Sequence, residues 1–130
     1  YDHPTNLFVA EFIGSPAMNL LRGAVVKDGV KVADGTVLPL PAKHKAKAGQ
    51  KVVYGIRPEH LKPSKKGSKA KVVVVEPTGP EIHIYADLGG QEVCAITDER
   101  LALARDDMID LSPKHDKIHL FDAESGKALA

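Results

Sequence analysis

The chain has 130 residues, and its 43% hydrophobic and 27% charged content is typical of one folded domain with a real core. The absence of tryptophan and the scarcity of aromatic residues argue against a broad stacking platform for single-stranded nucleic acid. A single cysteine, Cys94, excludes an internal disulfide, and no apolar run approaches the ~20 residues that span a bilayer.

Charge is distributed unevenly along the chain. Residues 43–71 hold ten Lys or Arg and one acid, a balance of +9, whereas the remainder holds eight basic and sixteen acidic residues and balances at −8. We favour a solvated basic surface over the alternative, a surface for an acidic partner such as nucleic acid, anionic lipid or protein. Because Tyr54 is the only aromatic residue in this segment, we expect no nucleic-acid partner.

The first predicted element is a short helix over residues 5–12. Leu7, Phe8 and Phe12 fall close together on a wheel of 3.6 residues per turn, and the Gly-Ser-Pro sequence at residues 14–16 ends the pattern. The chain begins at Tyr1 rather than at a methionine, so we expect it to be part of a longer protein.

The next part of the chain predicts short strands joined by tight turns. The predicted strands cover residues 18–27, 30–33, 36–38 and 51–56. Asp28-Gly29 predicts a hairpin turn with positive φ, and Asp34-Gly35 predicts a second turn. A proline-interrupted, lysine-rich loop separates the last two of these strands.

The second half of the chain continues in the same way after a basic loop predicted over residues 62–68. The predicted strands cover residues 71–76, 82–88, 92–96, 108–111 and 117–121, with a final pairing at 128–129. Residues 77–80 and Gly89-Gly90 predict turns. Residues 97–107 are compatible with either a short helix or an edge strand.

Four consecutive valines at residues 72–75 predict a strand that is apolar on both faces, as at a barrel contact or a subunit contact. Turn signals recur at short intervals and helical patterns are scarce, which predicts an all-β fold with a minor helical contribution, either a small barrel or a sandwich. The hairpins fall into two groups, before and after residue 68.

Residues 55–61 (GIRPEHL) place an arginine, a glutamate and a histidine at the end of a strand. Pro58 fixes its own φ and pushes Arg57 toward an extended conformation, while Leu61 provides an apolar anchor. Glu59 and His60 complete the cluster, which would serve as a pH switch or a partner contact. We favour a structural role, in which an ion pair holds the turn.

This heptapeptide, together with residues 8–19, 75–79 and 119–122, resembles the C-terminal regulatory domain of the ATPase subunits of ABC importers of the maltose and glycerol-phosphate type. The resemblance covers nearly the whole chain. It implies a TOBE, OB-like fold, with two small intertwined β-barrels over residues 17–130. It also implies that residues 1–16 are a linker helix that leads from an ATPase domain outside the chain.

The resemblance further implies a non-catalytic regulatory and dimerisation role, with ATP and Mg²⁺ bound by the ATPase domain and no cofactor in this chain. The implied partners are a second copy of the subunit, membrane-spanning permease subunits reached through the ATPase domain, and a regulatory protein, at the cytoplasmic face of a bacterial membrane. The candidate structural or regulatory contacts are Phe12, Ser15, Arg57, Glu59, His60, Thr78 and Gly79.

A second interpretation is a barrel that senses a small ligand or an oxyanion, as molybdate-type relatives do. Such a site would use backbone N–H groups in turns such as the one at Ser15 or at Thr78-Gly79. The imported solute is left open by the sequence.

No catalytic or metal-binding residues are predicted. Gly126-Lys127 is followed by Ala128 rather than Ser or Thr, so it is not a Walker A loop, and we expect the chain not to be an enzyme. His115 and His119 would lie ~13 Å apart on a strand, too far to share a metal ion. Cys94 is expected to be a packing residue.

Overall fold

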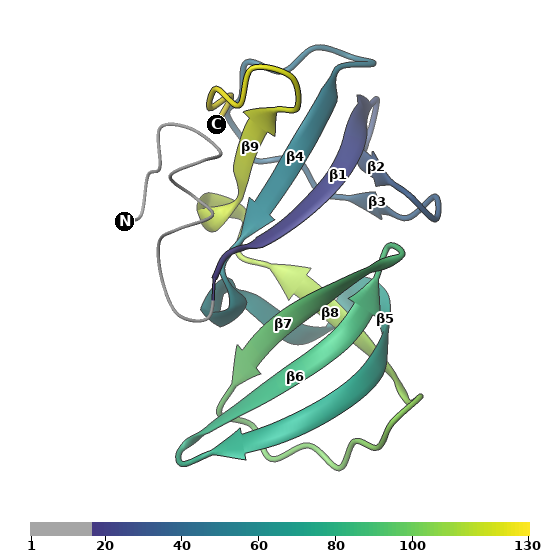
Figure 1. Cartoon of the computed structure of the whole chain (residues 1–130), viewed down its shortest axis with the longest axis vertical. Helices are drawn as coiled ribbons and strands as arrows, with labels where there is room; N and C mark the ends of the chain where they lie inside the picture. The colour runs from purple at the N-terminus through teal and green to yellow at the C-terminus, as the bar shows by residue number, and fades with distance from the viewer. Residues whose placement is uncertain (1–16) are drawn as a thin grey trace.

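The computed structural model describes residues 17–130, which form two antiparallel β-sheets (Figure 1). In the first sheet the strands have the order β3-β2-β1-β4-β9. They are β1 (Asn19–Val26), β2 (Gly29–Val32), β3 (Val37–Leu38), β4 (Lys51–Ile56) and β9 (His119–Asp122).

In the second sheet the order is β7-β6-β5-β8. Its strands are β5 (Leu61–Thr78), β6 (Glu81–Leu88), β7 (Gln91–Thr97) and β8 (Met108–Pro113). Two short 3₁₀ turns, η1 (Pro58–His60) and η2 (His115–Lys117), carry the chain from the first sheet to the second and back again. The first sheet is therefore completed by the last strand in the sequence.

The all-β prediction is confirmed, but the chain divides between its sheets at η1 and not at residue 68. Over residues 17–130 the strand pairings leave both sheets open, so the structure shows two open sheets where we expected two intertwined barrels. The predicted helix over residues 5–12, and with it Phe12 and Ser15, lies outside the described residues.

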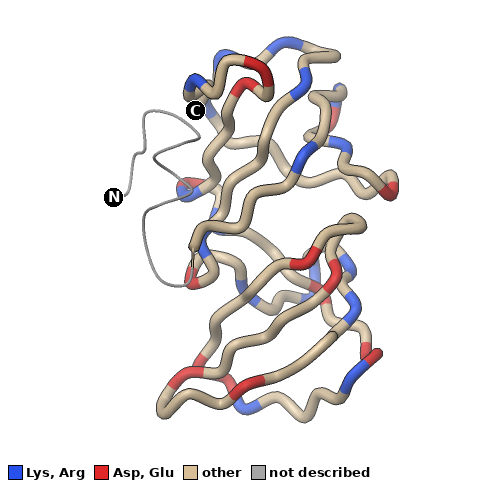
Figure 2. The backbone as a smooth tube through the Cα atoms, viewed as in Figure 1, with Lys and Arg blue, Asp and Glu red and all other residues tan. Residues whose placement is uncertain are grey.

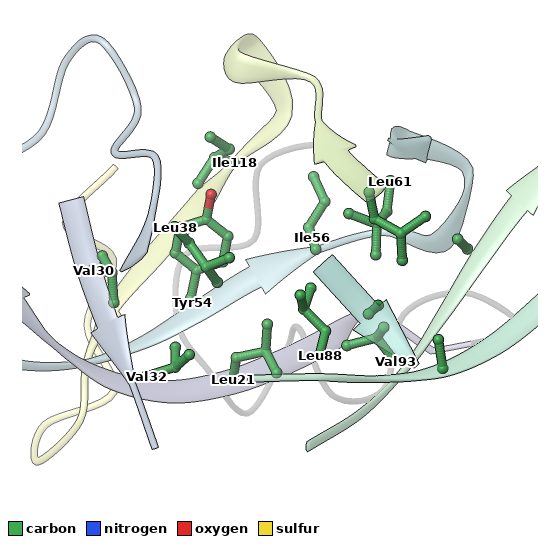
Figure 3. Packing of buried hydrophobic residues seen from close by; sticks show 14 of the residues in the cluster. Leu21, Val30, Val32, Leu38, Tyr54, Ile56, Leu61, Leu88, Val93 and Ile118 are labelled. Atoms are coloured by element: carbon green, nitrogen blue, oxygen red, sulfur yellow. The ribbon is translucent and has the colours of Figure 1, made fainter. Parts of the chain in front are cut away.

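One hydrophobic core joins the two sheets. Figure 3 shows Ile56 and Leu61, on either side of η1, close to Leu88 and Val93 of the second sheet, and each of these side chains is at most 2% exposed. Because burial of each such side chain contributes roughly 1.5–3 kcal/mol, the shared core strongly favours close contact between the two sheets.

The predicted turn at Gly89-Gly90 is confirmed. Leu88 pairs with Gln91 across it, and the two glycines have φ of 65° and 84°, as a tight primed hairpin requires. The Cβ of a residue at position 89 would run into the side chain of Val32 in the other sheet, so this turn is also a point of close inter-sheet contact.

The turn at Asp28-Gly29 was predicted one residue too late. Val26 pairs directly with Gly29, so Lys27 and Asp28 are the loop residues, and Gly29 begins β2. None of these residues has positive φ. Gly29 is needed instead because a side chain there would collide with the backbone carbonyl of Leu38 in β3.

The predicted loop over residues 62–68 is wrong, because this segment belongs to the long strand β5. Pro63 and Ser68 both lie opposite Leu111 of β8, so the residues between them are extruded as a bulge while pairing continues on either side. The local signals for a loop were correct for the bulge, but they gave no indication of the strand that continues on either side of it.

Residues 98–107 form neither the helix nor the edge strand that we considered. Leu101 and Leu103 both pack half-buried against the core, and this two-residue spacing belongs to extended chain. The backbone is tied to β5 only at Val72, whose N–H donates to Asp107 O and whose carbonyl accepts from Asp106 N, both at 2.8 Å.

The valine run at residues 72–75 is a strand, as predicted, but it is not covered on both faces. Its register with β6 shifts between Val72 and Val74, so Val73 is an additional residue in the strand. Val72 is 1% exposed whereas Val74 is 42% exposed. The bulge thus turns one valine of the run toward the solvent.

A Gly89→Ala substitution is expected to lower the free energy of unfolding by roughly 2–4 kcal/mol, since it adds a collision with Val32 to the cost of positive φ. Gly79→Ala is the matched control, because Gly79 has φ of 70° but no atom within 4 Å of an added Cβ. Urea unfolding of both variants measures the difference. Equal losses would show that the turn at Gly89 makes no inter-sheet contact.

Candidate functional site

Residues 55–61 form the crossover between the two sheets. β4 ends at Ile56, Arg57 is extended with φ −72° and ψ 147°, η1 follows, and Leu61 begins β5. The extended backbone at Arg57 is the conformation that a following proline imposes, and Pro58 occupies the first position of η1, where its missing N–H costs nothing.

The crossover is largely an interior structure. Arg57 is 1% exposed and has the largest side chain of the fully buried residues, and it is flanked by buried Ile56 and Pro58. Glu59 and His60 are half-buried. The predicted cluster of Arg57, Glu59 and His60 therefore lies at the junction of the sheets, with the arginine facing inward.

His60 links η1 to the end of the second sheet. Its backbone N–H donates to the carbonyl of Arg57, and its backbone carbonyl accepts from the N–H of Lys114, both at 2.9 Å. Burial lowers the pKa of His60, Glu59 opposes this shift, and the positive charges of Lys117, Lys114 and Arg57 reinforce it. Its Nδ1 is buried with no hydrogen-bond partner in the described part of the chain. Burial and the neighbouring positive charges thus disfavour the charged imidazolium form of His60.

Beside the crossover, β1 of the first sheet is hydrogen-bonded to the edge of β7. The Asn19 amide donates Nδ2–H to Cys94 O, and its Oδ1 accepts from Cys94 N, both at 2.8 Å and both buried. Three residues further along β1, Arg22 N donates to Gln91 Oε1 at 3.3 Å. β1 and β7 thus run antiparallel along a junction that we call the β1–β7 seam.

A lysine completes the seam. Lys62 Nζ donates to Ile96 O at 2.8 Å, two residues beyond Cys94 on the same edge of β7. The sequence did not predict these contacts. The only signals were a polar residue, Asn19, beginning an apolar strand, and Cys94 within a strand of small and apolar residues. Cys94 is buried, and burial raises the pKa of its thiol.

The structure does not bring all the predicted contact residues together. Thr78 and Gly79 lie in the exposed turn between β5 and β6, at the opposite end of β5 from the crossover. Thr78 Oγ1 donates to Glu81 O at 3.4 Å, which is a contact within the turn. The crossover and this turn are therefore separate features.

The basic segment is also divided. Lys43, Lys45 and Lys47 lie in the connection before β4, whereas the lysines at positions 62–71 lie on β5 of the second sheet (Figure 2). Two of the latter are close to acids, with Lys69 4.0 Å from Asp110 and Lys71 3.7 Å from Asp106.

Residues 17–130 contain no recognisable metal centre. No group of three or more His, Cys, Asp or Glu side chains there has the geometry to hold a metal ion. His115 lies in η2 and His119 in β9, so the two are not on one strand as we assumed. The helical turns of this part of the chain are too short to cross a membrane.

Two known protein families match the chain. The family described as TOBE domain matches residues 54–121, and the family described as MalK OB fold domain matches residues 14–61. The chain therefore belongs to the TOBE domain family. The two matches overlap at residues 54–61, which contain the crossover.

Proteins of similar sequence include ATP-binding proteins of transporters. The chain is 42% identical to an uncharacterised ABC transporter ATP-binding protein of Sinorhizobium fredii, over 100% of the chain and 36% of that protein. It is 34% identical to the sn-glycerol-3-phosphate import ATP-binding protein of Chromobacterium violaceum, over 99% of the chain and 36% of that protein.

A third relative is the sulfoquinovosyl glycerol transport ATP-binding protein of Agrobacterium fabrum, which is 32% identical over 99% of the chain and 38% of that protein. The chain thus spans little more than a third of these relatives. Among solved structures, the cytoplasmic molybdate-binding protein ModG superposes with a TM-score of 0.63, covering 78% of this chain and 94% of that one. At 17% identity, this likeness shows a shared fold.

Asn19→Ala is expected to lower the free energy of unfolding by roughly 2–4 kcal/mol, because it leaves the N–H and carbonyl of Cys94 buried and unpaired. Gln91→Ala serves as the control, since it removes one longer, exposed hydrogen bond of the same seam and should cost less than about 1 kcal/mol. Denaturant unfolding distinguishes the two. A loss for Asn19→Ala no larger than that for Gln91→Ala would contradict the structural role of the seam.

His60 makes stability depend on pH. Because its folded pKa is lowered, the unfolded chain binds more protons near and below the ordinary histidine pKa, and stability should fall as the pH is lowered from about 7.5 to 5.5. His60→Gln should flatten this dependence, and urea unfolding at the two pH values measures it. Parallel losses in both proteins would refute the assignment to His60.

Proposed function

We propose that the chain is the C-terminal regulatory and dimerisation domain of the ATP-binding subunit of an ABC importer for sugars or related carbohydrate solutes. The observation that carries the proposal is the pair of adjoining family matches, which together extend over residues 14–121. Alignment of essentially the whole chain with about a third of several transporter ATP-binding proteins supports it.

In this proposal the chain has no catalytic step of its own. ATP and Mg²⁺ are bound and used by an ATPase domain, and residues 1–16 form the linker from that domain to the regulatory domain over residues 17–130. The Gly126-Lys127 pair fits this division, because Gly126 has φ of 77° in a turn after β9, where its N–H donates to Asp122 O. That geometry is a chain reversal and not a phosphate loop.

The mechanical role is to hold two ATP-binding subunits together while their ATPase domains open and close. The shared core and the β1–β7 seam support this role, because a domain that keeps two moving partners together must itself move as one body. Contact with permease subunits through the ATPase domain, association with a regulatory protein and a position at the cytoplasmic face of the membrane belong to the same proposal.

The second sheet offers a surface for the contact between copies. Val74 is 42% exposed and Met108 is 56% exposed, and Met108 pairs with Lys71 only three residues before Val74. Large apolar side chains exposed near one another on neighbouring strands are typical of protein contacts. We assign the dimer contact to this part of β5 and β8.

Val74→Asp is expected to weaken self-association of the subunit, with its ATPase domain attached, by roughly tenfold or more, because a carboxylate would be buried in the contact. Val37→Asp provides a matched control, since Val37 is equally exposed, at 42%, but lies on the first sheet. Light scattering and analytical ultracentrifugation measure association. The dimerisation role fails if the unmodified chain is monomeric both alone and with its ATPase domain.

A further inference from the structure

The first sheet has a second buried cluster, on the face that points away from the second sheet. Met18, Val53 and Phe121 form this cluster, and each is at most 5% exposed. Val53 lies directly opposite Phe121 in the ladder, whereas the adjacent residues Val52 and Leu120 belong to the core between the sheets. Because successive side chains of a strand point to opposite faces, the cluster lies on the outer face of the first sheet.

The neighbours of this cluster lie beside it and not over it. Over residues 17–130, the partly buried hydrophobic side chains packed against it are those of Leu20 and Ala123. Leu20 lies opposite Gly55 on the same face of the sheet. Ala123 follows β9, and its N–H donates to the carbonyl of Lys51. The burial of the cluster therefore requires a further cover.

The same outer face continues into a positively charged half. Ala24 lies opposite both Lys31 of β2 and Lys51 of β4, and Arg22 lies opposite Val53. Since residues directly opposite each other share a face, the three cations surround Ala24. They line a hollow of about 440 Å³ whose lining contains no acidic residue. Within the described part of the chain, none of the three cationic side chains makes an ion pair.

The segment of residues 1–16 has the complementary composition. It contains two phenylalanines of the predicted helix, Phe8 and Phe12, which are four residues apart and therefore neighbours on one helix face. It also contains two acids, Asp2 and Glu11, and no lysine or arginine. The segment thus offers apolar side chains and negative charge to a face that is apolar in one half and positive in the other.

The order of these residues matches the order of the two halves. The segment joins the sheet at Met18, which packs at Gly55 in the apolar half, and its phenylalanines are closer to Met18 in the sequence than Asp2 is. Lys51 lies roughly 13 Å from Gly55 along β4, and a helix over residues 5–12 is roughly 12 Å long. A segment that reverses at its Gly-Ser-Pro turn is therefore long enough to cover both halves.

We propose that residues 1–16 fold back over the outer face of the first sheet, with Phe8 and Phe12 packed on the buried cluster and Asp2 facing the cationic hollow. Burial of the two aromatic side chains supplies the attraction, and charge complementarity determines which half each part of the segment covers. The occupant of this face is therefore a segment of the same chain.

This contact makes the segment a docked strap. The inference goes beyond the proposed function, in which residues 1–16 only connect two domains. A docked strap transmits a displacement of the ATPase domain directly to the first sheet, whereas a free tether would absorb it. This consequence rests on the proposed function, but the contact itself does not, and it is tested without the ATPase domain.

A spin label attached to a Thr5→Cys variant of the full chain tests the contact, since the native Cys94 is buried. In NMR spectra the amide signals of Ala24 and Val53 should be broadened more strongly than that of Ile84 in β6 of the second sheet. Uniformly weak broadening would mean that the segment moves freely and would overturn the proposal. Broadening in a mixture of isotope-labelled chain without the spin label and spin-labelled chain without the isotope would also overturn it, because the segment would then lie on a second copy.

Matched substitutions test the two halves of the contact. Phe12→Asp should lower the ratio of docked to undocked segment at least roughly tenfold, whereas Ala10→Asp adds the same charge on the opposite side of the predicted helix and should change it less than about twofold. Lys51→Glu should lower the ratio roughly two- to fivefold, and Asp2→Lys in the same chain should restore it. Equal effects of Phe12→Asp and Ala10→Asp, or no rescue by Asp2→Lys, would refute the arrangement.

Discussion

The open edge of β7 is the constraint on which the arrangement of the two sheets depends. β7 is an edge strand, yet residues 93–97 are buried, and buried backbone groups without partners cost about 1–3 kcal/mol each. The Asn19 amide provides both an acceptor and a donor to Cys94, and Lys62 satisfies Ile96 O. Side chains of β1 and early β5 therefore take the place of a neighbouring strand.

These side-chain hydrogen bonds explain how two sheets with unpaired edge strands still form one rigid unit. The strand pairings alone give two separate sheets, joined covalently at η1 and η2. The common core supplies most of the attraction between the sheets, but apolar packing has little directional preference. The β1–β7 hydrogen bonds define the register between the sheets. The buried Arg57 lies at the crossover that joins the two sheets.

Local signals predicted the parts of the fold that are encoded within a few residues. The alternation at residues 82–88 and the glycine pair at 89–90 define β6 and its turn without reference to the rest of the chain. The segment at residues 62–68 could not be predicted in this way. Its proline, glycine and lysines are typical of a loop, whereas its strand pairing is with β8, more than forty residues later.

The contacts of the candidate site were likewise predictable only where they depend on neighbouring residues in the sequence. The proline in residues 55–61 predicts a strand end and an extended Arg57, and the structure has both. The partner of Asn19 is 75 residues away, and no local pattern distinguishes an asparagine that meets a strand edge from one that caps a turn. A polar hollow lined by Asp28, Lys66 and Ser112 likewise combines residues from the β1–β2 turn, β5 and β8, which only the tertiary fold brings together.

Residue-resolved hydrogen exchange at the Cys94 amide tests most directly the claim that the seam makes two sheets into one body. The amide faces away from β6 and is bonded only to a side chain, so its protection reports on the seam itself. The account predicts that it exchanges as slowly as the amides of the central strand β6. Rapid exchange at Cys94, with β6 still protected, would show that the sheets separate in solution and would contradict the account.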